Sequence, residues 1–238
     1  MLDVRDDHDH DRMMEQQRMH ASAGRASAGP GETPSGQRRK RWFDVGLAAV
    51  GLVLSAPLWP LVAAAVKLED GGPVFFRQRR WGWRGERFTA LKFRTMNHDA
   101  DASGGSRPAT VADPRVTRTG RVLRATGLDE LPQLLHILRG QMSFVGPRAL
   151  AVDERVPDAD GVLRRYEEIP GFAERLQVRP GLTGHTTVHR PKDMPVREKF
   201  AADVAYVRSR TFAGDVVLVA LSLWISLRGR WEHRGRKL

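Results

Sequence analysis

The feature that most constrains this chain is a run without charged residues, from Val45 to Val66. A helix needs about 20 apolar residues to cross the hydrocarbon core of a bilayer, so this run is long enough to do so. It lies too far from Met1, and is too long, to be a cleavable signal peptide. Pro57 and Pro60 stand near its middle. Because proline removes a backbone donor and clashes with the preceding turn, we expect the helix to kink there.

Basic residues flank this run on both sides. The cluster Arg38 to Arg41 precedes it, and Arg77, Arg79 and Arg80 follow it. Positive charge tends to stay on the cytoplasmic side of a membrane, so both ends of the run are expected on that side. A bent helix that enters the bilayer and returns satisfies both observations and is the favoured interpretation. The alternative is a straight single span.

The tryptophans are placed in a way that supports membrane contact. None lies between residues 84 and 223, and five of the six flank or follow apolar stretches, where an interfacial belt would lie. The alternative, that some of them are core residues, stays open, above all for Trp224. The six are Trp42, Trp59, Trp81, Trp83, Trp224 and Trp231.

Charge is spread unevenly along the chain. The net charge is +11, but residues 1–37 carry −3, so the remainder carries +14. A basic body favours an anionic partner, and nucleic acid, an anionic membrane surface and phosphorylated substrates would all serve. Residues 1–37 show no apolar period and are predicted to be a disordered tail, with a metal site at its histidines as the weaker alternative. The absence of cysteine excludes disulfides and cysteine–metal sites.

Residues 69–227 have the pattern of one compact mixed domain. Strands are predicted at 73–78 and 87–95 as a hairpin, followed by a loop at 97–112. Helices are predicted at 118–126, 129–139 and 196–209, the last with Phe200, Val204 and Val207 on one face and Asp203 off that face. The apolar segment 216–227 is too short to span a bilayer, so we expect it at the interface or packed on the domain. The basic tail 228–238 is suited to lipid head groups.

Asp129 and Glu130 are the acidic pair most suggestive of chemistry. Apolar residues at 131, 134, 135 and 138 have helical spacing, so the pair is expected to open a helix, where the helix dipole should keep Asp129 ionised. An ionised carboxylate is a nucleophile toward phosphorus or a ligand for Mg²⁺. The alternative is a plain helix cap, because aspartate is a favoured N-cap residue.

Arginines crowd the segments around this pair. Beside Arg148 and Arg179 stand glycine and proline, which would let backbone amides approach an anion. Arginine offers a planar fork of donors that fits phosphate oxygens. Several such segments around an acidic pair, behind a membrane segment, indicate a diphosphate substrate used at a membrane. The other arginines are Arg115, Arg118, Arg121 and Arg124.

From Lys40 to Leu227 the chain resembles the small monotopic polyprenyl-phosphate sugar-1-phosphate transferases, also called bacterial sugar transferases. The resemblance rests on segments that occur in the family's order. They are Lys40-Arg41-Trp42-Phe43-Asp44, Gly72-Pro73-Val74-Phe75-Phe76-Arg77-Gln78, Lys92-Phe93-Arg94-Thr95-Met96, Asp113-Pro114-Arg115-Val116-Thr117, Leu128-Asp129-Glu130-Leu131-Pro132-Gln133-Leu134, Met142-Ser143-Phe144-Val145-Gly146-Pro147-Arg148, Arg179-Pro180-Gly181-Leu182-Thr183-Gly184 and Asp203-Val204-Ala205-Tyr206-Val207.

The resemblance implies a reaction. Asp129 would attack the β-phosphate of a UDP-sugar, UMP would leave, and polyprenyl phosphate would take the phosphosugar from the aspartyl intermediate. Glu130, with Asp129, would hold Mg²⁺, and Arg124 would bind phosphate. Four further residues match family positions in or beside the active site and are expected to bind substrate: Lys92, Arg148, Arg179 and Asp203. The bend of the membrane helix would lie at Pro57.

The sequence departs from the family's pattern in three places. After Gly184 the family has Trp-Ala-Gln-Val and then Asn-Gly-Arg, where this chain has His185-Thr186-Thr187-Val188-His189-Arg190. The identity of the sugar is therefore left open. Arg148-Ala149 and Ser55-Ala56-Pro57 replace the usual Arg-Pro and Ser-Pro.

Together these features predict a mainly helical α+β protein at the cytoplasmic face of the inner membrane. The expected parts are a tail (1–37), a re-entrant membrane helix (38–68), a catalytic domain with a small β-hairpin and interfacial amphipathic helices (69–227), and a basic tail (228–238). The expected partners are a UDP-sugar, polyprenyl phosphate and membrane lipid, with a homodimer left open and nucleic acid excluded. The alternatives are a membrane-tethered nucleotide binder and a scaffold without catalysis.

Overall fold

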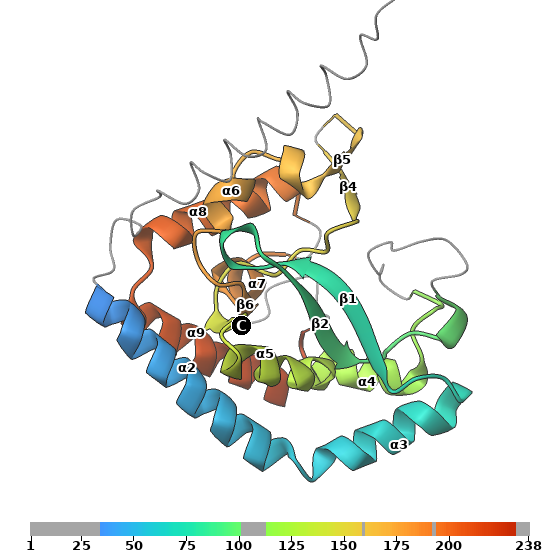
Figure 1. Ribbon diagram of the computed structural model, residues 1–238. Coiled ribbons are helices and arrows are strands. Elements are labelled where there is room, and N and C mark those ends of the chain that lie inside the picture. Colours follow the sequence, from blue (N-terminus) through green and yellow to red (C-terminus); the bar gives the residue numbers. More distant parts are fainter. Residues whose placement is uncertain (1–33, 101–112, 159, 192–193, 232–238) are drawn as a thin grey trace, which may run out of the picture.

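The computed structural model describes residues 34–100, 113–158, 160–191 and 194–231 (Figure 1). Most of the predicted tail, most of the predicted loop at 97–112 and the end of the basic tail lie outside these ranges. The chain forms a mainly helical α+β structure, as predicted. The principal elements are α2 (Pro34–Ser55), α3 (Leu58–Asp70), β1 (Phe75–Trp81), β2 (Arg87–Phe93), α4 (Arg118–Thr126), α5 (Leu134–Leu138), β3 (Ser143–Val145), β4 (Arg155–Pro157), β5 (Leu163–Arg165), α6 (Phe172–Arg175), β6 (Gly181–Thr183), α7 (His185–His189), α8 (Val196–Ser209) and α9 (Phe212–Leu227).

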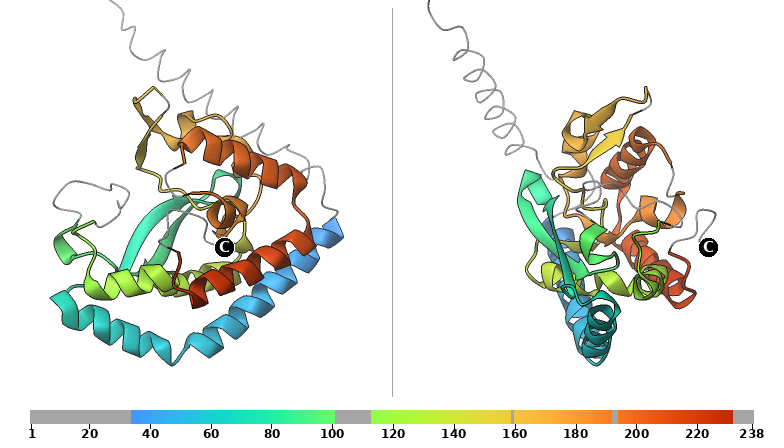
Figure 2. Two further views of the ribbon diagram at one scale, coloured as in Figure 1. Left: turned by 180° about the vertical axis from the view of Figure 1, so that it is seen from behind. Right: turned by 90° about the vertical axis from the view of Figure 1, so that its right-hand side faces the viewer.

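Helices α2 and α3 form a V at one end of the molecule, with the rest of the domain between and above its arms (Figures 1 and 2). The two axes are bent by 63°. The break lies at Ala56 and Pro57, where proline cannot continue the hydrogen-bond ladder, and Trp59 Nε1 donates to Ser55 Oγ across it at 3.2 Å. The predicted kink at Pro57 is therefore confirmed. Helix α2 already begins at Pro34, so the predicted tail boundary at residue 37 is wrong.

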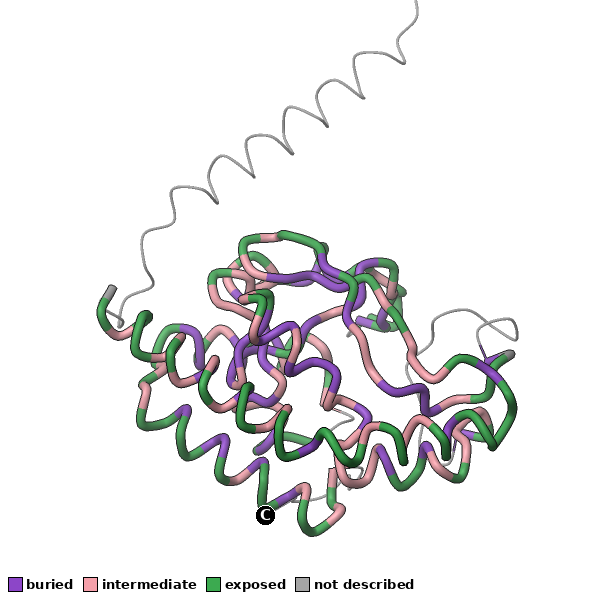
Figure 3. The backbone as a smooth tube through the Cα atoms, turned by 60° about the horizontal axis from the view of Figure 1, so that its bottom comes forward, coloured by how far each residue is buried: buried purple, intermediate pink, exposed green. Residues whose placement is uncertain are grey.

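By length and composition, none of the described helices could cross a membrane alone, whereas the bent pair α2–α3 could do so or dip in and return. Large apolar side chains are also exposed on several helices at the lower end of Figure 1, and Figure 3 shows exposed residues recurring along this side. Contiguous apolar exposure of this kind marks a surface for lipid or for a partner. The residues include Trp42, Val50, Val53 and Leu54 on α2, Leu58, Leu61 and Leu68 on α3, Val122 on α4, and Val216, Val217, Leu223, Trp224 and Leu227 on α9.

The tryptophans divide between this surface and the domain. Trp42 is 76% exposed and Trp224 is 47% exposed, which suits an interfacial position. Trp81 is buried against Phe172, and Trp83 lies at the tip of the β1–β2 hairpin, where Trp83 Nε1 donates to Gln177 O at 3.1 Å. For these two the expectation of membrane contact is wrong, because the hairpin folds back onto the segment before β6.

A buried ionic network fixes the N-terminal arm of the V to the domain. Lys40 Nζ lies 2.7 Å from Asp215 Oδ2 at the start of α9, and Tyr206 OH donates to the other oxygen of Asp215 at 2.7 Å. One turn along α2, Asp44 accepts from Ser143 Oγ at 2.7 Å. Arg41 donates to the carbonyls of residues 137 and 138 at the end of α5. The start of α2 is thus tied to α5, β3 and α9.

The C-terminal arm is fixed by two carboxylates at the end of α3. Asp70 receives both Nη groups of Arg94, which follows β2, and also accepts from the backbone of Gly72 and His98. Glu69 accepts from the backbone N–H groups of Arg118 and Thr119 at 2.6 and 3.1 Å, which satisfies free donors at the start of α4. Helix α3 therefore positions both β2 and α4.

In the part of the chain that the structure describes, the strands form three separate two-stranded sheets. The predicted hairpin is confirmed as antiparallel β1–β2, with register from Phe75↔Phe93 to Trp81↔Arg87, although its first strand runs three residues further than expected. The pair β4–β5 is antiparallel, and the pair β3–β6 is parallel.

The glycines of the two motifs around β3 and β6 serve backbone packing. A Cβ at Gly181 would lie 2.2 Å from the backbone N of Gly146, and one at Gly146 would lie 2.3 Å from the carbonyl of Arg179. Only glycine allows two backbone segments to cross this closely. The expectation that these glycines bring amides to an anion is replaced by a packing role, which places Arg148 just beyond the crossing.

Helix α8 coincides with the predicted 196–209. Asp203 is buried along with Phe200, Tyr206 and Val207, so the expectation that it points away from the apolar face is wrong. The reason is that α8 packs on α6 as well as on α7, so its buried face is wider than one apolar stripe. In α9, Leu218, Val219, Ser222 and Ile225 are buried while its other side is exposed, so packing and interfacial exposure coexist.

Removing the carboxylate of Asp70 should destabilise the junction between α3 and β2. Arg94 hydrogen bonds hold the pKa of Asp70 down to about 2, so its contribution is complete above about pH 4 and is lost as the pH falls toward 2. Asp70→Ala leaves the buried Arg94 unpaired, which costs about 3 kcal/mol. Thermal unfolding at pH 7 should shift by roughly 6–12 °C.

Asp160→Ala is the matched control, because Asp160 pairs with Arg164 at an exposed site. Such pairs contribute about 0–1 kcal/mol, so the melting temperature should move by less than about 4 °C. Equal shifts for the two variants would contradict the assigned role of Asp70.

Candidate functional site

The acidic pair lies in a tight turn between α4 and α5. Helix α4 ends at Thr126 and is capped by Gly127, whose φ of 75° is left-handed and suits glycine. A short 3₁₀ helix, η3 (Leu128–Gln133), follows. The predicted helix 129–139 is therefore a 3₁₀ turn followed by α5. Gly127 is the N-cap of η3, and no side chain caps it, so the interpretation of Asp129 as a helix cap is wrong.

Asp129 is a buried carboxylate with cations around it. Its residue is 7% exposed, and among the described residues none donates a hydrogen bond to its side chain. Burial and the neighbouring Glu130 raise its pKa, while Lys92, Arg124 and Arg148 oppose that rise. The expectation that a helix dipole would hold Asp129 ionised is thus replaced by a balance between desolvation and nearby cations. A carboxylate without hydrogen-bond donors keeps its lone pairs available for attack.

Glu130 is bound to Arg148. The Nη2 of Arg148 donates to Glu130 Oε1 at 3.0 Å, and the guanidinium is about half exposed. Burial alone would raise the pKa of Glu130, but Arg148, Arg80 and Lys92 outweigh it and keep that pKa below its usual range. Glu130 therefore stays charged while its neighbour is the one whose pKa rises.

Lys92 projects from the inner face of β2, the strand that packs on η3. It pairs across the hairpin with Phe76, and its Nζ lies 5.2 Å from the centre of the Phe76 ring. Burial and the nearby Arg80 lower its pKa to about 8, although Asp129 and Glu130 act to raise it. The ammonium is thus in electrostatic contact with both carboxylates.

Arg124 is held in place by the segment after β2. Its Nε donates to Thr95 Oγ1 at 2.8 Å, so Nε is used and the two Nη groups form the end of the side chain. Helix α4 lies very close to this segment, because a Cβ at Gly120 would be 2.1 Å from the carbonyl of Thr95. The structure therefore brings together Lys92, Arg124, Asp129, Glu130 and Arg148, as the sequence predicted.

Arg179 and Asp203 lie elsewhere. The Nε of Arg179 donates to the carbonyl of Gly140 at 2.8 Å, and its guanidinium stacks 4.4 Å from the Trp83 ring. Asp203 accepts from Arg175 Nε at 2.7 Å and from Thr186 Oγ1 at 2.6 Å. Neither is among the groups with the largest effects on the pKa of Asp129.

Three charged residues near the site were not expected from the sequence. Arg80 is buried and donates to Gln78 Oε1 and to the carbonyl of Ala149, and burial lowers its pKa to about 10. Arg175 donates to the carbonyl of Arg148 at 3.1 Å. Burial raises the pKa of Glu154, while Arg80, a hydrogen bond with Tyr166 and Arg148 act against this rise. For Arg80 the sequence held one signal: an arginine stands at an inward-facing position of β1, where an apolar residue is the norm.

The donor set fits a divalent cation only in part. No group of three or more metal-ligating side chains occurs within the described residues, but Asp129 and Glu130 offer adjacent carboxylates. Mg²⁺ is commonly held by one or two carboxylates and completed by substrate phosphate and water. The site therefore suits a cation that arrives with a phosphorylated ligand. Cationic side chains beside a buried carboxylate suit transfer of a phosphoryl group.

Comparison with known proteins agrees with this chemistry. A family model described as bacterial sugar transferase matches residues 35–229. The exopolysaccharide production protein ExoY of Rhizobium meliloti is 41% identical over 200 residues, covering 78% of this chain and 84% of that protein. The UDP-glucose:undecaprenyl-phosphate glucose-1-phosphate transferase of Caulobacter vibrioides is 43% identical over 187 residues (76% and 67%). An Escherichia coli protein of the same name is 37% identical over 204 residues (81% and 42%).

Proposed function

The chain belongs to the bacterial sugar transferase family and is a phosphoglycosyl transferase, and we propose that it moves a sugar-1-phosphate from a UDP-sugar to polyprenyl phosphate with release of UMP. Relatives are named as UDP-glucose:undecaprenyl-phosphate glucose-1-phosphate transferases, so UDP-glucose and undecaprenyl phosphate are the first substrates to test. The observation that carries the proposal is the buried Asp129 carboxylate, which lacks donors among the described residues and faces three cations.

In the first step, an oxygen of Asp129 attacks the β-phosphorus of the UDP-sugar. The bond from that phosphorus to the bridging oxygen breaks, and UMP leaves with the bridging oxygen and its electron pair. An aspartyl-phosphosugar remains. In the second step, an oxygen of polyprenyl phosphate attacks the same phosphorus, and Asp129 leaves as a carboxylate. No net proton transfer is needed, so the site requires no general base.

The cations lower the repulsion between an anionic nucleophile and an anionic diphosphate. Lys92, Arg124 and Arg148 come from β2, α4 and the segment after β3, so the charge is fixed before substrate arrives. Preorganised charge of this kind is usually the largest single contribution to catalysis. Asp129 and Glu130 would hold Mg²⁺, which neutralises diphosphate charge when it is bound. Glu130 would exchange part of its contact with Arg148 for this ligand.

We also propose that the enzyme works at the cytoplasmic face of a membrane. The bent pair α2–α3 would enter the bilayer at its apex and return, and the exposed apolar residues of α4 and α9 would lie at the interface. The arms of the V join the domain through Lys40 and Asp70, so the site would be held close to the head groups. A long lipid acceptor presents its phosphate at this level.

Removing the carboxylate of Asp129 should abolish transfer. With UDP-glucose, undecaprenyl phosphate and Mg²⁺ in detergent, Asp129→Asn should release UMP at least about 1,000-fold more slowly than the wild-type protein, because an amide is a poor nucleophile. Glu130→Gln should retain more activity. Asp160→Asn, at the exposed Arg164 pair, is the matched control. Wild-type rates in Asp129→Asn would refute the proposed nucleophile.

The pH dependence should be bell-shaped. Burial and Glu130 raise the pKa of Asp129 above its ordinary value, so kcat/KM should fall as the pH drops and that carboxylate is protonated. Burial lowers the pKa of Lys92 to about 8, so kcat/KM should also fall as the pH rises through about 8 and the ammonium is lost. Lys92→Arg should remove the alkaline limb, since arginine stays protonated. An unchanged alkaline limb in Lys92→Arg would contradict this assignment.

Cysteine labelling can decide the topology, because the chain contains no cysteine. Ser35→Cys and Leu68→Cys place thiols at exposed positions near the two ends of the V, and Ala205→Cys reports on the domain. A re-entrant pair predicts that a membrane-impermeant maleimide modifies all three in inside-out vesicles and none in right-side-out vesicles. Modification of Ser35→Cys and Leu68→Cys from opposite sides would show a straight span instead.

A further inference from the structure

The backbone around Arg148 is held at four consecutive carbonyls by four different donors. Pro147 O accepts from Gly181 N at 3.0 Å, and Leu150 O accepts from Trp81 N at 2.8 Å. Between them, the carbonyls of Arg148 and Ala149 accept from the buried side chains of Arg175 and Arg80, at 3.1 and 2.9 Å. The side chain that this backbone carries is the one bound to Glu130.

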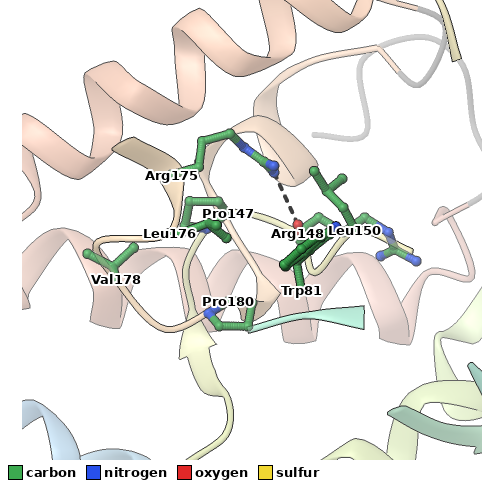
Figure 4. Close-up of a pocket in the computed structure, with 8 residues that line it drawn as sticks. All are labelled: Trp81, Pro147, Arg148, Leu150, Arg175, Leu176, Val178 and Pro180. Atoms are coloured by element: carbon green, nitrogen blue, oxygen red, sulfur yellow. Dashed lines mark hydrogen bonds between the residues drawn. The ribbon is translucent and has the colours of Figure 1, made fainter. Parts of the chain in front are cut away.

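The guanidinium of Arg175 points at the backbone carbonyl of Arg148, as Figure 4 shows. Its Nη2 donates to Arg148 O, its Nε donates to Asp203 Oδ2 at 2.7 Å, and its guanidinium stacks 4.3 Å from the Phe200 ring. Asp203 is fixed in turn by Thr186 Oγ1. The guanidinium is therefore held by a carboxylate, a carbonyl and an aromatic face.

Substrate has no room to reach Arg175 at this point. The cavity lined by Trp81, Arg148 and Arg175 measures about 10 Å³, which is the space of roughly one water molecule. Arg175 is 4% exposed and Asp203 is 5% exposed. The Arg175–Asp203 pair can therefore affect the reaction only through the residues that it contacts.

Energetics also argue against a purely stabilising role. A buried ion pair gains little over well-packed apolar side chains, because desolvation of both charges offsets their attraction. Burial lowers the pKa of Arg175, and Asp203 acts against this fall. A buried arginine pair suits a position where a hydrogen bond must point in a fixed direction, because a guanidinium donates along fixed axes.

We propose that Arg175 and Asp203 are positioning residues that orient Arg148 toward Glu130 and the donor diphosphate. Asp203 fixes the guanidinium of Arg175, Arg175 fixes the carbonyl of Arg148, and the side chain of Arg148 then meets Glu130. Asp203 therefore serves the site from behind Arg148 and does not contact substrate. This inference rests on the proposed function of the Asp129 site.

The test is a double-mutant cycle of Arg175→Met and Arg148→Ala, with Asp203→Asn as a milder change. Two quantities are measured for each protein: the Kd of UDP by calorimetry and kcat/KM for UMP release. In the wild-type background, Arg175→Met should lower kcat/KM roughly 100-fold, since displacement of a reacting group by about 1 Å has this effect. With Arg148 already truncated, the same change should alter both quantities by no more than about 2-fold.

A matched control separates positioning from folding. Arg164 lies in β5, away from Arg148, and pairs with the buried Asp158. Arg164→Met should therefore leave kcat/KM and Kd unchanged. The melting temperature of each variant reports on the fold. Arg175→Lys should retain part of the activity, since an ammonium can reach one of the two partners, Asp203 or the carbonyl of Arg148, but not both.

Equal losses from Arg175→Met with and without Arg148 would overturn the positioning role while leaving the proposed function intact. So would a variant that binds UDP and turns over as the wild type does. A wild-type protein that neither binds UDP nor releases UMP would overturn the proposed function, and the inference with it.

Discussion

Asp129 and Glu130 are adjacent carboxylates in a turn that excludes most water. Their buried negative charge must be balanced by cations, and this requirement shapes the surrounding fold. Lys92, Arg124 and Arg148 reach the pair from three segments separated in sequence. Arg148, Arg80 and Lys92 keep Glu130 ionised, and Lys92, Arg124 and Arg148 limit the rise in the pKa of Asp129. Arg124 is held by Thr95, and the backbone that carries Arg148 is held by the crossing at Gly146 and by Arg175.

The V of α2 and α3 and the site are joined by side-chain contacts at the end of each arm. Helix α3 ends in Glu69, which binds the start of α4, and in Asp70, which binds Arg94 directly after β2. These are the elements that carry Arg124 and Lys92. Helix α2 is tied through Arg41 to the end of α5, the helix that follows the acidic turn. Both arms of the V therefore position elements that carry or adjoin the site residues.

Local features of the sequence were enough to predict the bend at Pro57, the β1–β2 hairpin, α4 and α8, because each depends on neighbouring residues. The group of Lys92, Arg124, Asp129, Glu130 and Arg148 followed from family resemblance. The contacts that Arg80 and Arg175 make with the backbone carbonyls at 149 and 148 could not be predicted, because they join segments distant in the sequence. The burial of Asp203 was missed because α8 packs on both α6 and α7, which one helical stripe does not reveal.

The central claim is that Asp129 becomes covalently bound to the phosphosugar. Wild-type protein is mixed with UDP-glucose and Mg²⁺ without lipid acceptor, quenched in acid and analysed by intact-mass and peptide mass spectrometry. The account predicts an added hexose phosphate on the peptide that contains Asp129, lost when undecaprenyl phosphate is added before the quench and never formed in Asp129→Asn. UMP release at the wild-type rate with no adduct at any time after mixing would contradict it and indicate direct transfer between the two substrates.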